Sequence, residues 1–559
     1  MVGMDTKISA VVKDLFGVET NVTVTRPHPR FGDFATNVAL QLAGQLGQPA
    51  RDIAEQIKTK LIETGEFAEV SVAGPGFINI RQNDQEMLAG TRTSVRRQPG
   101  TARIVRPRYG QRIVIETNNP NPFKAMHIGH AFNAVLADTI ANLLEYDSAE
   151  VHRVSYHGDV GLHVGKSMWA LLRFVDGDTA KLHAVAPVER NSFMSRMYAE
   201  GARTYKDDEA ARTAIDRLTQ QSFTLDDPLY KEVYEICKAW SFEAIDTITA
   251  RLGNRPIEKR YLESQADALG VKTVRAHVGD VFIESNGALV FPGEKYGIFD
   301  NVFVTSRGLG LYGARDLGLM QLKNNDYHPN KSYIVTAEEQ RDYFRGVIKA
   351  AELCLPELKD MTINISTGTV KLTTGKMSSR TGEVVEIDWL FNRIAEAIRQ
   401  RGGEPDDAIV AGALRYQFLK VRIGSDVVFD VNEAVSLHGN SGPYLQYAYA
   451  RARSILVKSK APPLQSTENG SIKLTEAERA LVRKLSAYNG VVAMASRELL
   501  PHQIATYLHE LAQEFNRFYE KNHVIGSDRE AERITLVDTY ATTLKLGLTI
   551  LGITAPEKM

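Results

Sequence analysis

Two histidines three residues apart are the first side chains in this chain whose spacing suggests chemistry. The string His127-Ile128-Gly129-His130 follows a short apolar run (residues 112–117) and a turn-rich loop, and a long amphipathic stretch (residues 129–146) follows it. A strand, a loop and a helix in this order begin a parallel α/β sheet, and free N–H groups at such a helix N-terminus bind phosphates. Imidazoles can donate to phosphate oxygens, and Gly129 lets a flat ring approach the backbone. We therefore expect a nucleotide here.

A second string combines two cations with small, flexible residues. It reads Gly375-Lys376-Met377-Ser378-Ser379-Arg380 and lies far downstream of the histidines. Lys376 and Arg380 could neutralise the charge of a departing pyrophosphate. Taken alone, the string is more simply explained as a solvated surface loop.

The elements that must position these strings are those of an α/β enzyme with several domains. A chain of 559 residues is too long for one hydrophobic core, and 43% hydrophobic with 24% charged residues is ordinary for a globular protein. A second strand is expected at 151–154, and strands return at 302–304 and 332–335. The mostly helical, charged stretch from about 168 to 289 is interpreted as an insertion between the two halves of the sheet.

The two ends of the chain have different patterns. Residues 53–61 have helical periodicity, whereas 70–72 and 77–81 are typical of strands joined by a turn. A basic stretch with Gly and Pro, from Arg92 to Gly110, is interpreted as a linker, and from about Asp430 the pattern is helical to the end. The expected domains are therefore 1–100 (α+β), 101–430 (parallel sheet with the insertion) and 431–559 (all α).

Composition excludes several classes of site. The two cysteines, Cys237 and Cys354, are far apart and have no partner at metal-binding spacing, so we expect neither a disulfide framework nor a zinc site. No signal peptide or bilayer-spanning run is expected, which favours a cytoplasmic protein. A net charge of −1 does not indicate a nucleic-acid binder, although local basic patches would suffice.

Together the two strings resemble the paired HIGH and KMSKS signatures of class I aminoacyl-tRNA synthetases. The resemblance implies a Rossmann-like catalytic domain that activates an amino acid with ATP, accompanied by Mg²⁺, and transfers it to a tRNA ribose. It implies catalytic roles for His127, His130, Lys376 and Arg380. For ATP binding it implies His127, Gly129, His130, Lys376, Met377 and Ser378.

The segments around the signatures resemble the arginyl enzymes of this class. The segment Glu116-Thr117-Asn118-Asn119-Pro120-Asn121-Pro122-Phe123-Lys124 is similar to their sequence before HIGH, and Lys124 would act on the ATP phosphates in place of the KMSKS lysine that Ser379 replaces. Gly158-Asp159-Val160-Gly161 and Tyr312-Gly313-Ala314-Arg315-Asp316 match two further segments, but Val160 stands where Trp is usual and Ala314 where Thr is usual. The implied arginine-binding residues are Glu116, Asn118, Asn121, His130, Glu263, Tyr312, Asp316 and Gln340.

The chemistry of these residue types fits arginine. A guanidinium has five N–H donors in a planar fork and needs carboxylates placed to accept them. Asp316 and Glu263 supply negative charge, and the Tyr312 hydroxyl can donate or accept beside them. Asn121 and Gln340 offer amide oxygens to the α-ammonium group. Each acid taken alone is more simply explained as a surface ion pair.

Both flanking domains also resemble arginyl enzymes. Phe77 and Asn79 lie in a segment similar to the N-terminal domain that binds the tRNA elbow and D-loop, and they could stack on and hydrogen-bond a base; strand packing and a turn amide explain them equally well. Tyr444 and Arg451 lie where the helical anticodon-binding domain of the family begins. The implied partners are tRNA-Arg, L-arginine and ATP, with no zinc and no membrane, for a monomer whose activation step depends on tRNA.

Two alternatives stay open. A class I enzyme for cysteine would need zinc-binding thiols, and one for lysine would lack the Pro-Asn segment and the Tyr-Gly-Ala-Arg-Asp match. A non-catalytic tRNA-binding or regulatory paralogue would be free to lose His127, His130 and Lys376, which are intact here. The departures at Val160 and Ala314 keep this second alternative open.

Overall fold

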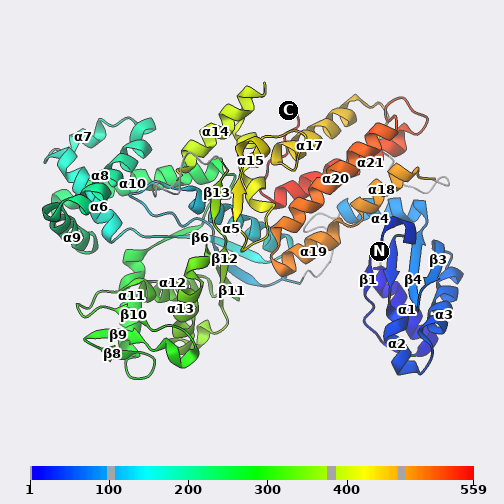
Figure 1. Cartoon of the computed structure of the whole chain (residues 1–559), viewed down its shortest axis with the longest axis horizontal. Coiled ribbons are helices and arrows are strands. Elements are labelled where there is room, and N and C mark those ends of the chain that lie inside the picture. Colours follow the sequence, from blue (N-terminus) through cyan, green and yellow to red (C-terminus); the bar gives the residue numbers. More distant parts are fainter. Residues whose placement is uncertain (1–2, 97–106, 374–384, 464–472) are drawn as a thin grey trace.

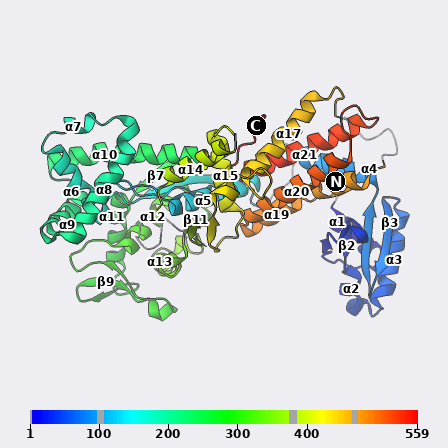
Figure 2. The same cartoon turned by 45° about the horizontal axis from the view of Figure 1, so that its top comes forward.

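A computed structural model of the chain describes residues 3–96, 107–373, 385–463 and 473–559. The whole second string (residues 375–380) therefore lies outside the described residues, including the predicted site residues Lys376, Met377, Ser378 and Arg380. The molecule is elongated, with the N-terminal unit at one end and the helices of residues 162–251 at the other, in both views (Figures 1 and 2).

The N-terminal unit is a four-stranded antiparallel sheet with helices packed against it. The strands lie in the order β1 (Val24–Thr25), β2 (Phe34–Thr36), β4 (Phe77–Gln82) and β3 (Phe67–Ala73), and the helices are α1 (Met4–Phe16), α2 (Val38–Leu46) and α3 (Ala50–Glu63). Ile78 and Ile80 of β4 share a buried core with Ile53 and Ile57 of α3. The predicted helix and both predicted strands are confirmed. The predicted linker is wrong at its start, because helix α4 (Asp84–Arg96) continues past Arg92.

The central element is a five-stranded parallel sheet. Its order is β12 (Thr362–Thr367), β11 (Lys331–Ala337), β5 (Arg112–Glu116), β6 (Glu150–His157) and β7 (Lys259–Leu262). From β5 the chain builds outward first through β6 and β7 and then on the other side through β11 and β12. In open parallel sheets, ligands bind at the carboxyl ends of the strands where the order reverses, which here is between β5 and β11. Helix α5 (Ile128–Tyr146), which follows β5, is confirmed within one residue of its prediction.

The insertion is more complex than predicted. Between β6 and β7 stand helices α6 (Leu162–Val175), α7 (Ala180–His183), α8 (Arg190–Asp207), α9 (Glu209–Thr224) and α10 (Pro228–Arg251). The single insertion predicted over 168–289 is wrong in part, because β7 lies inside that range and belongs to the main sheet. Helix α11 (Glu263–Ala276) follows β7.

A second, small sheet accounts for another difference. Strands β8 (Ile283–Ser285), β9 (Ala288–Phe291) and β10 (Asn301–Val304) pair antiparallel with each other. The strand predicted at 302–304 exists, but it is not part of the parallel sheet, because periodicity identifies a strand without identifying its partner. Helices α12 (Tyr312–Tyr327) and α13 (Arg341–Cys354) then frame β11, and β13 (Val370–Leu372) pairs with β14 (Val427–Phe429).

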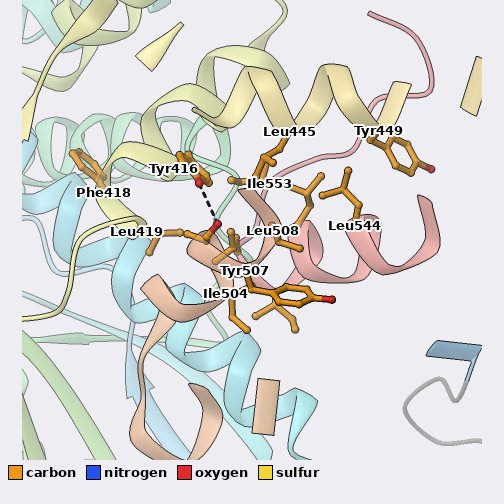
Figure 3. Close-up of a cluster of buried hydrophobic side chains, with 14 of the residues drawn as sticks. Tyr416, Phe418, Leu419, Leu445, Tyr449, Ile504, Tyr507, Leu508, Leu544 and Ile553 are labelled. Atoms are coloured by element: carbon orange, nitrogen blue, oxygen red, sulfur yellow. Dashed lines mark hydrogen bonds between the residues drawn. The ribbon is translucent and has the colours of Figure 1, made fainter. Parts of the chain in front are cut away.

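The C-terminal part is helical, as predicted. Its helices are α14 (Ile387–Gln400), α15 (Asp407–Leu419), α16 (Val431–Ala434), α17 (Gly442–Lys458), α18 (Glu476–Leu485), α19 (Tyr488–Glu498), α20 (Pro501–Lys521) and α21 (Glu530–Ile550). Figure 3 shows how α15 enters this bundle: Tyr416 and Leu419 lie near apolar side chains of α17 and α20. The Phe418 ring lies apart from them and packs against Phe132 of α5 and Phe429 of β14. The Tyr416 hydroxyl also donates to the carbonyl oxygen of Ala505 at 3.1 Å. One continuous core therefore joins the sheet to the bundle.

Arg415 of α15 is a fully buried cation whose hydrogen bonds join distant segments. Its guanidinium donates to Asp138 Oδ2 on α5 at 3.0 Å and to the carbonyl oxygens of Leu252 and Leu551 at 2.9 and 2.8 Å. The other carboxylate oxygen of Asp138 accepts from Arg153 of β6 at 3.2 Å. Asp138 therefore fixes α5 to β6 and to α15, and through Arg415 to the segments that follow α10 and α21.

The N-terminal unit meets the bundle through a second polar joint. Arg479 of α18 donates to the carboxylates of Asp33 and Asp84 and to the carbonyl oxygen of Gln82. Arg26 donates to the carbonyl oxygen of Ser486 at 3.0 Å. These bonds place the four-stranded sheet beside α18, where both views show it.

We expect the Arg415→Met substitution to destabilise the chain by about 3–5 kcal/mol, because it leaves the Asp138 carboxylate and two carbonyl groups with fewer partners in a buried site. Urea unfolding followed by circular dichroism measures the change. Arg453→Met on α17 is the matched control: its ion pair with Glu557 is exposed, so about 1 kcal/mol or less should be lost. Equal losses in the two variants would contradict the role given to Arg415.

Candidate active site

The two histidines of the first string cap the N-terminus of α5. His127 is the N-cap residue, and its Nδ1 accepts from the backbone N–H groups of Gly129 and His130 at 3.2 and 3.3 Å. His130 Nδ1 in turn accepts from the backbone N–H of His127 at 3.4 Å. Because both Nδ1 atoms accept, we assign the ring proton of each histidine to Nε2. The two rings are stacked with centroids 3.6 Å apart.

Gly129 has a specific role in this arrangement. A Cβ atom at position 129 would lie 3.2 Å from Cε1 and Nδ1 of the His127 ring, closer than ordinary contact. In the described structure, the flat ring that lies against Gly129 is therefore the imidazole of His127. An isolated bridge between His127 and Glu386, with the Ile128 N–H donating to the Val385 carbonyl at 2.9 Å, ties the string to the chain after the second string.

Both histidines are neutral donors at neutral pH. Burial, with a smaller contribution from the Lys124 charge, lowers the pKa of His127 from 6.5 to about 4. Burial, followed by the His127 and Lys124 charges, holds the pKa of His130 well below its usual range. Neutral imidazoles can still donate from Nε2 to a phosphate oxygen.

Lys124 is held beside these rings by a strained loop. The preceding residue, Phe123, has a φ of 65°, which is uncommon for a bulky side chain. Its N–H donates to Ser241 Oγ at 3.0 Å, and its carbonyl accepts from Ser167 Oγ at 2.7 Å. Burial and the neighbouring Lys166 lower the pKa of Lys124. The strain is offset by these contacts, and it directs a partly desolvated ammonium group toward the helix N-terminus.

His157 fixes the loop from the other side. Its Nδ1 lies 2.6 Å from the Pro120 carbonyl oxygen and its Nε2 lies 2.9 Å from Ser155 Oγ, in a fully buried position. Burial lowers the pKa of His157 to about 3. The turn that carries Asn121 is thereby anchored to the end of β6.

Three of the predicted acids gather at the carboxyl edge of the sheet. Glu116 ends β5, Glu263 begins α11 directly after β7, and Asp316 lies on the first turn of α12. Glu116 and Glu263 both raise the pKa of Asp316, which shows that their charges act on one region. The structure therefore brings together the acids that the resemblance implied.

Two of these acids already have cations. Glu116 Oε1 lies 2.6 Å from the Lys323 ammonium, and its Oε2 accepts from Asn119 Nδ2 at 2.6 Å. Glu263 Oε2 accepts from Arg315 at 2.8 Å. Sequence reasoning missed both cations, although Arg315 stands next to Asp316. Glu116 is thus satisfied within the chain, and Glu263 retains only Oε1 for a ligand.

Asp316 differs from the other two acids. Within the described residues it has no ion pair, and its Oδ2 accepts from the Tyr343 hydroxyl at 2.5 Å. Burial is the largest cause that raises the pKa of Asp316, from 3.8 to about 7, with the neighbouring acids adding to it. This carboxyl group is the one in the cluster that lacks a cation.

The remaining residues of the predicted arginine site are less uniform. Asn121 Oδ1 accepts from the Gly158 N–H at 3.0 Å, which leaves its amide nitrogen and one lone pair of Oδ1 for a ligand. Asn118 is buried and faces α10, with Nδ2 3.5 Å from Thr249 Oγ1. Tyr312 is 65% exposed at the start of α12. Gln340 is exposed after β11. The last two lie at the rim of the cluster.

Two of the four residues predicted to bind RNA are buried. Asn79 is 8% exposed in the middle of the N-terminal sheet, and Tyr444 is 9% exposed and accepts from Asn516 Nδ2 at 3.0 Å. Their burial argues against direct contact with a base. Phe77 is 44% exposed, so it can offer a stacking surface. Arg451 stacks on the Tyr519 ring, with 4.5 Å from its guanidinium carbon to the ring centroid.

The described residues contain neither a metal-binding cluster nor a membrane-spanning helix. No group of three or more His, Cys, Asp or Glu side chains could hold a metal ion there. No helix in the same part of the chain is long and apolar enough to cross a bilayer.

Comparison with known proteins identifies similar sequences along almost the whole chain. Three family models match: "Arginyl tRNA synthetase N terminal domain" at 4–82, "tRNA synthetases class I (R), catalytic domain" at 100–425 and "DALR anticodon binding domain" at 445–559. An arginine–tRNA ligase of Frankia casuarinae is 30% identical, and one of Bdellovibrio bacteriovorus is 29% identical. Each match covers 96% of this chain and 94% of the relative.

Solved structures agree. An arginyl-tRNA synthetase of Thermus thermophilus superposes with a TM-score of 0.77 at 25% identity, covering all of this chain and 99% of that one. The Plasmodium falciparum arginyl-tRNA synthetase has a TM-score of 0.75 at 20% identity, with 100% and 98% coverage, and so shares the fold.

The buried His157 predicts a pH dependence of stability. In the unfolded chain a histidine takes up its proton near pH 6.5, whereas in the folded chain His157 does so near pH 3. Its contribution to stability is therefore full above about pH 6.5 and is lost as pH falls below that value, by about 1.4 kcal/mol per pH unit. Between pH 5 and 6, we expect His157→Gln to reduce the slope of the unfolding free energy against pH by about this amount.

Urea unfolding at several pH values measures the slope. His183→Gln is the matched control, because the His183 side chain is exposed and solvated in both states. An unchanged slope in His157→Gln would contradict the neutral state assigned to His157.

Proposed function

Because the chain belongs to the arginyl-tRNA synthetase family, we propose that this site activates L-arginine with ATP and then transfers it to tRNA-Arg. The distribution of charge at the edge of the sheet supports this reaction. Neutral imidazole donors and Lys124 lie at the N-terminus of α5, and an acid cluster follows β5, β7 and the start of α12. Asp316 is the observation that carries the assignment to arginine, since it is the acid that has no cation of its own among the described residues.

The first step is an in-line attack of the arginine carboxylate on the α-phosphorus of ATP. A carboxylate–phosphorus bond forms as the bond to the bridging oxygen breaks, which gives arginyl-adenylate and pyrophosphate. No general base is needed, because the carboxylate is ionised at neutral pH. His127 and His130 would donate from Nε2 to phosphate oxygens, where charge is greatest in the transition state. Lys124 would stabilise the same charge.

The departing pyrophosphate needs further cations. We propose that Lys376 and Arg380 stabilise the departing pyrophosphate and that Met377 and Ser378 contact ATP. The bridge between His127 and Glu386 supports this, because it ties the chain after that string to the histidines. Lys124 would then take the role of the lysine that Ser379 replaces. Mg²⁺ bound to ATP would neutralise the same phosphates.

The second step transfers arginine to tRNA. The terminal ribose 2′-hydroxyl attacks the carbonyl carbon of the adenylate and loses its proton as the ester bond forms. AMP leaves with the pair of electrons from the broken mixed-anhydride bond, and the proton is released to the AMP phosphate or to solvent. We propose that residues 1–100 bind the tRNA elbow and D-loop and that residues 431–559 bind the anticodon arm. We also propose a cytoplasmic monomer in which activation depends on bound tRNA.

The distribution of cations among the three acids supports arginine over the other substrates of this class. Glu116 already accepts at both of its oxygens, and Glu263 has one oxygen bonded to Arg315 and only Oε1 left. Asp316 has no cation among the described residues and can accept the planar fork of a guanidinium. Asn121 Nδ2 can donate to the substrate carboxylate, and Glu263 Oε1 can accept from its α-ammonium group. A Cβ at Gly158 would lie 3.0 Å from Glu263 Oε1 and 3.1 Å from Asn121 Oδ1, so both groups border the same small space.

Pyrophosphate exchange with each of the twenty amino acids, with and without total tRNA, tests the function. We expect exchange with arginine alone, and only when tRNA is present. His130→Ala should slow this exchange about 100- to 1000-fold, because one phosphate donor is lost, while tRNA binding stays nearly unchanged. Exchange with a different amino acid would refute the function, and parental exchange in His130→Ala would refute the role of His130.

The raised pKa of Asp316 gives a second test. With a pKa of about 7 the empty site is mostly protonated at pH 6 and mostly ionised at pH 8. A guanidinium binds the ionised form, so the Kd for arginine should rise about tenfold from pH 8 to pH 6, and arginine binding near pH 7 should release about half a proton.

Isothermal titration calorimetry in buffers of different ionisation enthalpy measures both quantities. Asp316→Asn should weaken binding and abolish the pH dependence. A Kd for arginine that is constant from pH 6 to pH 8 would show that Asp316 is not the group that binds the guanidinium.

A further inference from the structure

Tyr156 lies at this edge of the sheet. It is not among the residues that the resemblance to arginyl enzymes implied. It is the penultimate residue of β6, between β5, which ends in Glu116, and β7, which Glu263 follows. Its backbone N–H donates to Asn119 Oδ1 at 2.9 Å, which fixes the strand end to the loop after β5. The strand order therefore places Tyr156 between two of the three acids.

The third acid approaches Tyr156 from above the sheet. Asp316, Leu319 and Lys323 are spaced i, i+3 and i+7 on α12 and so share one helical face. Lys323 of this face reaches Glu116 of β5, and Leu319 belongs to the buried cluster against which the Tyr156 ring packs. The same helical face that covers Tyr156 thus carries Asp316.

The hydroxyl group of Tyr156 has no hydrogen-bond partner within the described residues, although its oxygen is buried. A buried unpaired hydroxyl is rare and destabilising, so it needs an explanation. Burial raises the pKa of this hydroxyl well above 10, and the charges of Asp316, Glu263 and Glu116 raise it further, so it stays protonated and close to all three acids. Yet each acid has a different hydrogen-bond partner. Glu116 accepts from Lys323, Glu263 accepts from Arg315, and one oxygen of Asp316 accepts from the Tyr343 hydroxyl.

We propose that the Tyr156 hydroxyl oxygen accepts a hydrogen bond from the substrate guanidinium and so contributes to selection of arginine. This inference rests on the proposed function. A guanidinium has five N–H donors in one plane, and Asp316, one of whose oxygens already accepts from Tyr343, cannot accept all of them. Tyr156 supplies a further acceptor under the same helix. The single ammonium nitrogen of lysine cannot reach two acceptors spaced for a planar fork.

The chain contains a matched control for this role. Tyr261 of β7 is the residue paired with Tyr156 in the sheet, and its ring lies in the same buried cluster. Its hydroxyl, however, donates to Asp326 Oδ2 at 2.5 Å and so is satisfied inside the chain. Tyr156→Phe and Tyr261→Phe therefore each remove one hydroxyl group from the same buried cluster.

We expect Tyr156→Phe to raise the KM for arginine about 10- to 100-fold while kcat and the KM for ATP stay within about threefold, because the guanidinium is bound equally in the ground and transition states. The Ki of agmatine, which keeps the guanidinium but has no carboxylate to react, should rise by the same factor. Tyr261→Phe should leave both constants unchanged. Steady-state aminoacylation and exchange assays measure them.

Thermal unfolding separates this role from a structural one. Tyr156→Phe removes a hydroxyl without a partner and should not lower Tm, whereas Tyr261→Phe removes a hydrogen bond and should lower it. Parental KM in Tyr156→Phe, an equal rise of KM in Tyr261→Phe, or a fall in Tm at Tyr156→Phe like that of Tyr261→Phe would each overturn the inference. A parent chain that does not charge arginine would overturn the proposed function itself, so the two failures are distinguishable.

Discussion

The structure depends on one buried carboxylate, Asp138, in the middle of α5. Two guanidinium groups share it, Arg153 from β6 and Arg415 from α15, and all three side chains are almost completely buried. A buried charge that loses its partner is strongly destabilising, so each of these residues requires the other two. Because α5 also carries His127 and His130 at its N-terminus, the same bonds that join the bundle to the sheet fix the position of the phosphate donors.

Charge at the site is separated into two regions by the order of the strands. The N-terminus of α5 and Lys124 form a positive region beside β5, and the acids form a negative region that extends toward β7 and α12. Free arginine carries its carboxylate at one end and its guanidinium at the other. The proposed binding mode matches this separation, with the carboxylate toward the phosphates and the guanidinium toward Asp316. The internal cations Lys323 and Arg315 reduce the repulsion between acids so that one of them remains unpaired.

Local patterns predicted local structure well and long-range pairing poorly. The run before His127 and the periodicity after it predict β5 and α5 nearly to the residue, because strand and helix periods are properties of neighbours in sequence. The membership of β7 in the main sheet and the separate pairing of β10 depend on contacts between distant segments. For the same reason the acids Glu116, Glu263 and Asp316 could be predicted from their motifs, whereas the partner of Glu116, 207 positions away, could not. The burial of Asn79 and Tyr444 could not be predicted from the sequence either, because both are polar residues in an ordinary strand and an ordinary helix.

Ala314 lies where α11 packs against α12. A Cβ atom at Gly270 of α11 would overlap the carbonyl oxygen of Ala314, and one at Gly318 of α12 would overlap the carbonyl oxygen of Ala266. The two backbones are therefore in direct contact, and the fully buried Ala314 is a small residue beside that contact. Glu263 begins α11 and Asp316 lies on the first turn of α12, so the close approach of the helices sets the separation of these two acids. Small residues at the crossing thus determine the geometry of the charged groups at the site, although none of them is itself polar.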